Sequence, residues 1–212
     1  MFTILISILF TVMTQFTHLQ ATKSQEQVLA YHEFSLNKRY ENKEVNKIFK
    51  DNILLTLRYA RGEQINPAKI DWRQIGKPFQ TKLVLTPGET FAFHDDVLPE
   101  YGGKVNKTMN AHFNSSEGFK SDGYLVGDGV CHLASLLYWV AQDAGLDPQA
   151  PTRHDFAPVP EVPQKYGVSI YSGLGKNSSS QVQNLYISNT KNKPIAFVFD
   201  YDGSKLAIKA VD

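Results

Sequence analysis

The clearest pattern of apolar positions in the chain lies between residues 130 and 144. Apolar side chains recur there at the three- and four-residue spacing of an α-helix. These residues are Leu133, Leu136, Leu137, Val140, Ala141 and Ala144. Gly145 and the pair Asp147-Pro148 end the pattern. Because the stretch GDGVCHLAS leads into this segment, we predict a helix that begins at a glycine-rich turn around Cys131.

A second helical pattern lies nearer the N-terminus, between residues 24 and 62. This region is rich in Glu, Gln, Lys and Asn, and some of its apolar residues recur at helical spacing. These residues are Val45, Ile48, Phe49, Ile53, Leu54 and Leu57. We predict a helical N-terminal region over residues 23–78, with one or two amphipathic helices and with His32 in a helix.

The remaining apolar segments are short and favour β-strands. Residues 79–93 are typical of two strands joined by a turn at Thr86-Pro87-Gly88-Glu89. Four further β-rich segments follow the helix at Cys131, and the last two read as a hairpin. They cover residues 168–171, 184–188, 194–200 and 206–211. The predicted fold class is α+β, with N-terminal helices, one central helix opened by the cysteine motif, and a mainly antiparallel sheet.

The first 22 residues form an apolar N-terminal segment. Apolar side chains dominate from Phe2 to about Phe16, and the first lysine is Lys23. This stretch is short for a membrane span and fits a secretory signal peptide cleaved after Ala21, although no basic residue precedes it. An uncleaved anchor and a buried helix are the alternatives. We therefore expect an exported protein, periplasmic or extracellular, that touches the membrane only through this segment if it is not cleaved.

Composition narrows the classes of partner. The chain has 212 residues, with 22 basic and 21 acidic side chains and no long basic stripe, so we expect no nucleic-acid partner. It contains one cysteine, Cys131, and therefore no internal disulfide. A lone thiol in an exported protein is core filling, a link to another chain, or a reactive group.

Cys131 is the candidate nucleophile. A thiol in the first turn of a helix faces unpaired N–H groups and the positive end of the helix dipole, which lower its pKa. His154 is the candidate general base, and either Asp155 or Asn184 could orient it. We expect Gly127, Asp128 and Gly129 to form a backbone cradle that a ligand approaches closely, together with Asn184. His132 is expected at the edge of this pocket.

The other histidines and the aromatic residues carry weaker signals. His94, Asp95, Asp96 and His112 could form a metal site with Cys131 or His154, but none of their spacings matches a zinc motif. We therefore predict no metal and no cofactor. The aromatic residues are expected mostly in the core. They are Phe91, Phe93, Phe113, Phe119, Tyr124, Tyr138 and Trp139.

The stretch GDGVCHLASLLYWVAQDAGL resembles the signature of VanW-like domains, in which glycines precede a cysteine that opens a helix. LTPGETFAF, RHDFAPVP and NLYISN resemble three further motifs of that family in the same order, so the likeness spans about residues 79–209. Two departures stand out: His132 replaces the usual Gln, and the Asp expected after the Val-Pro segment is replaced near Tyr166-Gly167. The resemblance implies a protein of the bacterial cell envelope, associated in some organisms with glycopeptide-resistance gene clusters, and assigns no reaction.

The sequence thus predicts a signal peptide or anchor at residues 1–22, a helical region at 23–78 and a VanW-like domain at 79–212. The first functional hypothesis is a Cys-His-dependent hydrolase or acyltransferase that acts on amide or peptide bonds in peptidoglycan. The alternative is a non-catalytic module that binds cell-wall peptide or glycan.

Overall fold

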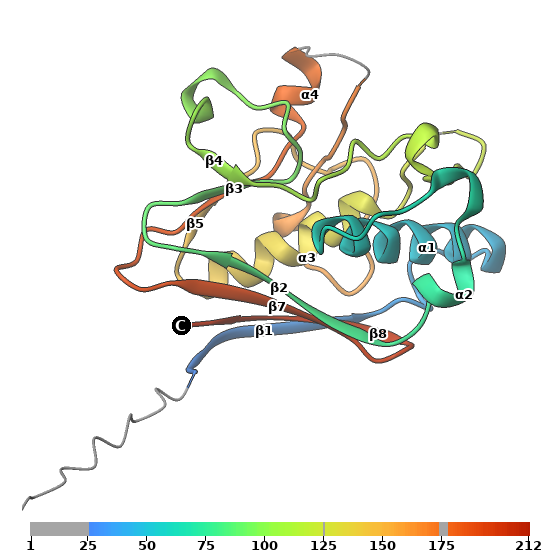
Figure 1. Ribbon diagram of the computed structural model, residues 1–212, viewed down its shortest axis with the longest axis horizontal. Helices are drawn as coiled ribbons and strands as arrows, with labels where there is room; N and C mark the ends of the chain where they lie inside the picture. Colours follow the sequence, from blue (N-terminus) through green and yellow to red (C-terminus); the bar gives the residue numbers. More distant parts are fainter. Residues whose placement is uncertain (1–25, 125, 174–177) are drawn as a thin grey trace, which may run out of the picture.

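The computed structural model describes residues 26–124, 126–173 and 178–212. The predicted signal peptide or anchor at residues 1–22 lies outside the described residues. Within the described ranges, no helix combines the length and the apolar character that crossing a membrane requires. The described chain combines helices with two mostly antiparallel sheets, and the α+β prediction is confirmed (Figure 1).

The larger sheet has four antiparallel strands in the order β1-β8-β7-β2. These are β1 (Val28–Ser35), β2 (Phe79–Leu85), β7 (Ile195–Tyr201) and β8 (Lys205–Val211). The predicted hairpin is confirmed as β7-β8, with Tyr201 paired to Leu206. The Asp202 carboxylate accepts the N–H groups of Ser204 and Lys205 at 2.7 Å each, which fixes the turn.

The strand β1 corrects the prediction that the N-terminal region is helical throughout. Ala30 and Phe34 are buried on it at even spacing, and β1 pairs along its length with β8. His32 therefore lies on a strand, where its ring stacks on Trp139 with the ring centroids 3.5 Å apart. Polar residues between the apolar ones hid the period of two, and pairing with β8 outweighs the helical bias of the local composition.

The smaller sheet has the order β4-β3-β6-β5 and very short strands. These are β3 (Thr90–Ala92), β4 (Val105–Lys107), β5 (Asp147–Gln149) and β6 (Tyr186–Ser188). The two predicted strands in residues 79–93 exist as β2 and β3, but they belong to different sheets. The predicted strand at residues 168–171 does not form, since only Val168 makes an isolated bridge, to Arg153. That segment instead runs past the start of the central helix.

Two long helices, α1 (Lys43–Ala60) and α3 (Val130–Asp143), cover one face of the larger sheet (Figure 1). Asn42 caps α1 by accepting the N–H groups of Glu44 and Val45. The short helices are α2 (Trp72–Ile75) and α4 (Ser178–Val182). Single 3₁₀ turns occur at Pro67–Lys69, Pro99–Tyr101, Ser115–Glu117 and Gln164–Tyr166. The helix predicted at the cysteine motif is confirmed as α3.

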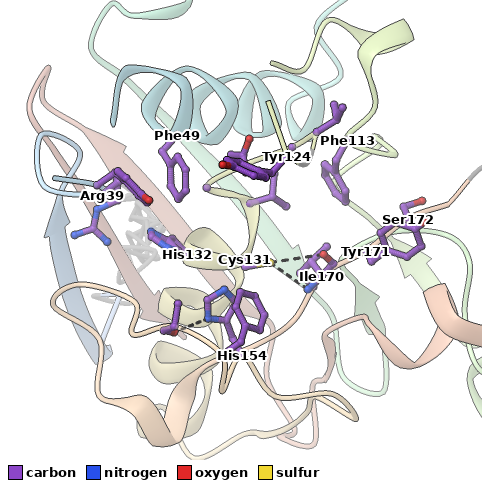
Figure 2. A pocket seen from close by; sticks show the side chains of 18 of the residues that line it. Arg39, Phe49, Phe113, Tyr124, Cys131, His132, His154, Ile170, Tyr171 and Ser172 are labelled. Atoms are coloured by element: carbon purple, nitrogen blue, oxygen red, sulfur yellow. Dashed lines mark hydrogen bonds between the residues drawn. The ribbon is translucent and has the colours of Figure 1, made fainter. Parts of the chain in front are cut away.

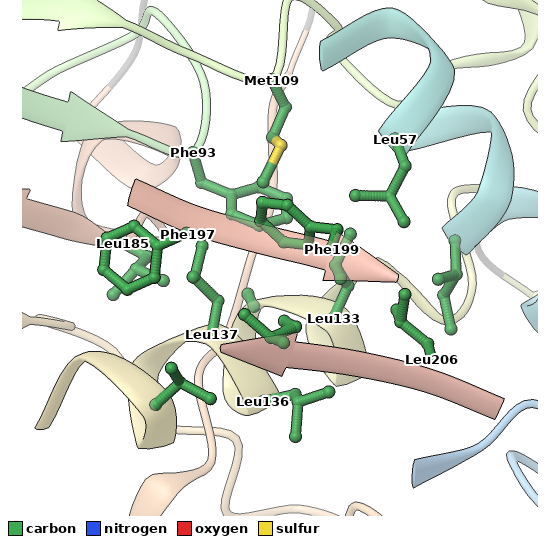
Figure 3. Close-up of a cluster of buried hydrophobic side chains, with 14 of the residues drawn as sticks. Leu57, Phe93, Met109, Leu133, Leu136, Leu137, Leu185, Phe197, Phe199 and Leu206 are labelled. Carbon is green, nitrogen blue, oxygen red and sulfur yellow. The ribbon is translucent and has the colours of Figure 1, made fainter. Parts of the chain in front are cut away.

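The core lies between α3 and the larger sheet (Figure 3). All six apolar residues predicted for one face of this helix are buried, from Leu133 to Ala144. They pack against buried residues of β7 and β8 that include Phe197, Phe199 and Leu206. Each such side chain contributes about 1.5–3 kcal/mol when fully buried, so α3 is held firmly along its length. Its first turn, with Cys131, is consequently fixed in place at one end of the core.

Candidate functional site

The turn before α3 is set by two glycines in the left-handed region. Gly127 has φ 87° and Gly129 has φ 92°. A Cβ atom on Gly129 would lie 2.7 Å from the carbonyl oxygen of Phe49, and one on Gly127 would lie 2.9 Å from that of Phe113. Glycine is thus required because the turn packs on other backbone segments. Both glycines also line the cavity described next, so the approach of a ligand to this backbone stays a prediction.

A cavity of about 470 Å³ opens at the first turn of α3 (Figure 2). This volume is within the range of small-ligand sites. The cavity is lined by residues from the start of α3 and from five other segments of the chain. The lining includes Arg39, Tyr40, Phe49, His112, Phe113, Tyr124, Val126, Gly127, Asp128, Gly129, Cys131, His132, His154, Phe156, Ile170, Tyr171 and Ser172. Cys131, His154, Asp128 and the two glycines therefore meet at one cavity, as the sequence suggested.

The Cys131 thiol is held by the backbone of Ile170. Its Sγ accepts the Ile170 N–H at 3.3 Å and donates to the Ile170 carbonyl oxygen at 3.6 Å. Burial, with a smaller contribution from the charge of Asp128, raises the pKa of the thiol to about 11. The lowered pKa expected at a helix start is therefore not found, because removal of the thiol from solvent has the largest effect on its pKa.

The N–H groups at the start of α3 are largely used within the protein. Val130 donates its N–H to the Gly127 carbonyl oxygen at 3.1 Å. His132 and Leu133 both donate to the Gly129 carbonyl oxygen, at 3.0 and 3.2 Å. Three of the donors that could have stabilised an oxyanion next to Cys131 therefore already have acceptors.

His154 is buried beside the cavity, and its Nδ1 lies 2.9 Å from the Ala157 carbonyl oxygen. A carbonyl oxygen only accepts hydrogen bonds, so Nδ1 carries the proton and Nε2 is unprotonated in the neutral ring. Burial lowers the pKa of His154, which keeps it neutral at pH 7. The Phe156 ring packs against it with the centroids 4.0 Å apart. Among the described residues, no hydrogen bond joins His154 to Cys131.

The two candidates for the orienting residue do not take that role in this structure. Asp155 is exposed, it does not line the cavity, and no described contact bonds it to His154. Asn184 is buried elsewhere, where its Oδ1 accepts the Phe93 N–H at 2.9 Å and its Nδ2 donates to the His94 carbonyl oxygen at 3.1 Å. The Ala157 carbonyl oxygen orients His154 instead. Asn184 ties the loop after β3 to β6 and is not part of the cavity.

His132 lines the cavity next to Cys131. Its ring meets Phe49 edge-on with centroids 5.0 Å apart, and His154 at 6.1 Å. Its Nδ1 is buried and has no hydrogen-bond partner among the described residues. Burial lowers the pKa of His132 well below its ordinary value, and the positive charge of Arg39 lowers it further, so the ring is neutral.

Asp128 is the acidic residue of the cavity. Its carboxylate accepts the Asp122 N–H at 3.0 Å, which ties down the loop that carries Tyr124. Burial raises the pKa of Asp128 to about 6, with a smaller contribution from the charge of Asp122. The Asn52 side chain donates to the Asp128 carbonyl oxygen at 2.9 Å and so links this loop to α1.

The structure brings together no metal site among the described residues. No group of three or more His, Cys, Asp or Glu side chains in those ranges is arranged to hold an ion. His112 lies between Asp95 and Glu117, with its ring nitrogens 2.9 and 3.1 Å from their carboxylates. Burial opposes the charged form of His112, but these two carboxylates outweigh it and raise the pKa.

The sequence analysis did not predict most of the aromatic residues that line the cavity. Nine large hydrophobic side chains are exposed in the described chain, and five of them line this cavity. These five are Tyr40, Tyr124, Val126, Phe156 and Tyr171. Tyr124 is the exception among the aromatic residues expected mostly in the core, because it is 92% exposed. Its position between Gly123 and Gly127, without helical or strand periodicity, was the available signal for an exposed loop.

Comparison with known proteins gives one result. The family model described as VanW like protein matches residues 79–211, which is more than half of the chain. The match runs from the first residue of β2 to the last residue of β8, and it includes every cavity residue except Arg39, Tyr40 and Phe49. Neither the comparison with curated proteins nor that with solved structures gives a match. The resemblance noted in the sequence is confirmed, and the chain belongs to the VanW like protein family.

Proposed function

We propose that this chain is a binding module of the bacterial cell envelope that holds a segment of cell-wall peptide or glycan in the cavity at Cys131. One observation carries the proposal: most of the exposed large hydrophobic side chains of the described chain gather around a single cavity. Grouped exposed apolar side chains favour a binding surface over random surface composition. The apolar N-terminal segment supports export, which would bring the cavity to the cell wall.

The state of Cys131 supports binding without covalent catalysis. With a pKa of about 11, on the order of one thiol in ten thousand is ionised at pH 7. A thiolate is the nucleophilic form of cysteine, so this thiol reacts slowly. Its contacts with Ile170 also satisfy the sulfur within the protein. Cys131 therefore serves to pack the first turn of α3 against residue 170.

A Cys-His enzyme acting on amide or peptide bonds of peptidoglycan is the second candidate. It is favoured by the fact that Cys131 and His154 line the same cavity and that Nε2 of His154 is unprotonated. In such an enzyme, Sγ would attack the carbonyl carbon while Nε2 takes the thiol proton. The Ile170 contacts of the thiol would first have to break, and this requirement places the enzyme second.

Co-sedimentation of the full chain with purified peptidoglycan sacculi separates the two candidates. We expect the chain to sediment with the sacculi, Cys131→Ala to sediment equally well, and Phe156→Ala to sediment less. Val84→Ala is the matched control, because Val84 is an exposed apolar residue outside the cavity. If the parent chain released soluble fragments from the sacculi and Cys131→Ala did not, the enzyme would be the better account of the function. Fractionation of bacteria that express the chain tests export, and recovery in the cytoplasm would contradict it.

A further inference from the structure

Among the lining residues that the structure describes, no cation is free to pair with a charged ligand. Arg39 is buried and its guanidinium pairs with Glu161 at 2.5 Å. His112 has a carboxylate on each ring nitrogen. Asp128 is ionised at neutral pH, since its pKa of about 6 lies below 7. A ligand carboxylate or phosphate entering the cavity would therefore meet repulsion from Asp128 and no unpaired positive charge from these described residues.

Two neutral imidazoles lie beside the cavity. Nε2 of His154 is unprotonated and has no hydrogen-bond partner among the described residues. His132 also lines the cavity, but its unpartnered Nδ1 is enclosed by protein atoms. A hydroxyl or amide N–H group of an uncharged ligand can therefore donate to Nε2 of His154.

Exposed aromatic rings surround these polar atoms. Tyr124 and Phe156 are 92% and 73% exposed, and both line the cavity with Tyr40 and Tyr171. In Figure 2, Phe49 and Tyr124 lie on one side of Cys131 and His154 on the other. A pyranose ring matches this arrangement, since its flat C–H face packs on an aromatic ring while its edge carries hydroxyl groups.

We propose that the cavity binds an uncharged sugar ring of the cell-wall glycan, with the sugar face against Tyr124 and Phe156 and a hydroxyl or acetamido group donating to Nε2 of His154. This inference rests on the proposed function and names its ligand as glycan in preference to peptide. The stem peptide is disfavoured by the charge of Asp128, and its carboxylates find no free cation among the described lining residues.

Isothermal titration calorimetry on the full chain at pH 7 tests the inference with two probes: a tetramer of β-1,4-linked N-acetylglucosamine and a stem tetrapeptide with a free carboxylate. We expect saturable binding of the sugar and none of the peptide. Phe156→Ala and His154→Phe should each weaken sugar binding about tenfold, the second because one hydrogen bond is lost. Tyr31→Ala is the control, because Tyr31 is an exposed tyrosine on β1 away from the cavity, and it should bind normally.

His154 is buried, so a folding defect in His154→Phe is checked by thermal unfolding, while Phe156 and Tyr124 are exposed and their alanine variants are expected to keep the fold. Binding of the peptide without the sugar would overturn the inference and leave a wall-binding function standing. Sugar binding that no cavity variant weakens would place the site elsewhere and also overturn it. Failure of both probes and of sacculi to bind would overturn the proposed function itself.

Discussion

Two buried histidines show how differently two regions of this molecule use their polar groups. Near the smaller sheet, the Nε2 of His94 lies 3.1 Å from the Gln183 carbonyl oxygen and its Nδ1 lies 3.3 Å from the Asn184 amide nitrogen. At the cavity, His132 is buried to a similar degree, yet its Nδ1 has no partner among the described residues. The region of His94 is thus hydrogen-bonded in a way that stabilises the fold, whereas the region of His132 gives up stability next to the cavity.

The backbone turn before α3, next to the cavity, is nevertheless tightly packed, and the largest effect of a substitution on stability is expected there. Gly129→Ala should lower the free energy of unfolding by about 3 kcal/mol, because the new Cβ would strain the left-handed backbone and clash with Phe49. Gly123→Ala is the matched control, since Gly123 also has a positive φ but no atom within 4 Å of its Cβ position. The control should cost about 1 kcal/mol. Equal losses in urea unfolding would show that the α1 contact does not constrain the turn.

The second-largest effect on stability is expected in the region of His94. Asn184→Ala should destabilise the fold by about 2 kcal/mol, because the Phe93 and Leu185 N–H groups and the His94 and Asp96 carbonyl oxygens lose buried partners. Asn192 is an exposed asparagine, and Asn192→Ala should change stability by less than about 0.5 kcal/mol. Urea unfolding measures both. An unchanged free energy of unfolding in Asn184→Ala would show that these hydrogen bonds do not stabilise the region of His94.

Replacing His132 and His94 by phenylalanine compares the two regions directly. His132→Phe should raise the free energy of unfolding by about 1 kcal/mol, since it removes a buried nitrogen that lacks a partner. His94→Phe should lower it by about 1–2 kcal/mol, because Gln183 and Asn184 lose their bonds to the ring. Opposite signs are expected in one urea-unfolding series. A loss of stability in both variants would mean that His132 is already bonded inside the fold.

The smallest effect is a pH dependence due to Asp128. Its pKa is raised to about 6 in the folded chain, so the folded state holds the proton more tightly than the unfolded state does. The contribution of Asp128 to stability is therefore fully present below the unfolded pKa of about 4 and is lost as pH rises through about 6. After allowance for partial exposure, we expect a loss of about 1 kcal/mol over this interval. Asp128→Asn should flatten that part of the curve, and an unchanged slope would assign it to other groups.

The sequence predicted the elements whose burial follows a simple period. The face of α3 from Leu133 to Ala144 and the β7-β8 hairpin are examples, because apolar spacing and turn residues are local signals. β1 was missed, since its burial depends on pairing with β8, more than 160 residues away along the chain. Pairing partners at such separation leave no mark on local composition.

The candidate site was predicted in part for the same reason. Cys131, His132 and His154 were found because a motif and its family likeness mark them, and all three line the cavity. Phe49 was missed because it reaches the cavity only through the packing of α1 on the turn at Gly129. Arg39 was missed because its guanidinium is held by Pro160 and Glu161, which are distant in the sequence. The pKa of Cys131 was misjudged because a helix start is visible in the sequence, while the burial of the thiol against Ile170 is a tertiary effect.

The central claim is that the cavity at Cys131 is a binding site whose thiol is not a nucleophile, and the pH dependence of thiol alkylation tests it most directly. The rate of reaction with iodoacetamide follows the thiolate fraction. In the folded chain we expect the rate at pH 7.5 to be about a hundredfold below that of the urea-unfolded chain and to keep rising toward pH 11. A fast rate that levels off near neutral pH, and that His154→Ala slows, would contradict the account and restore the cysteine enzyme.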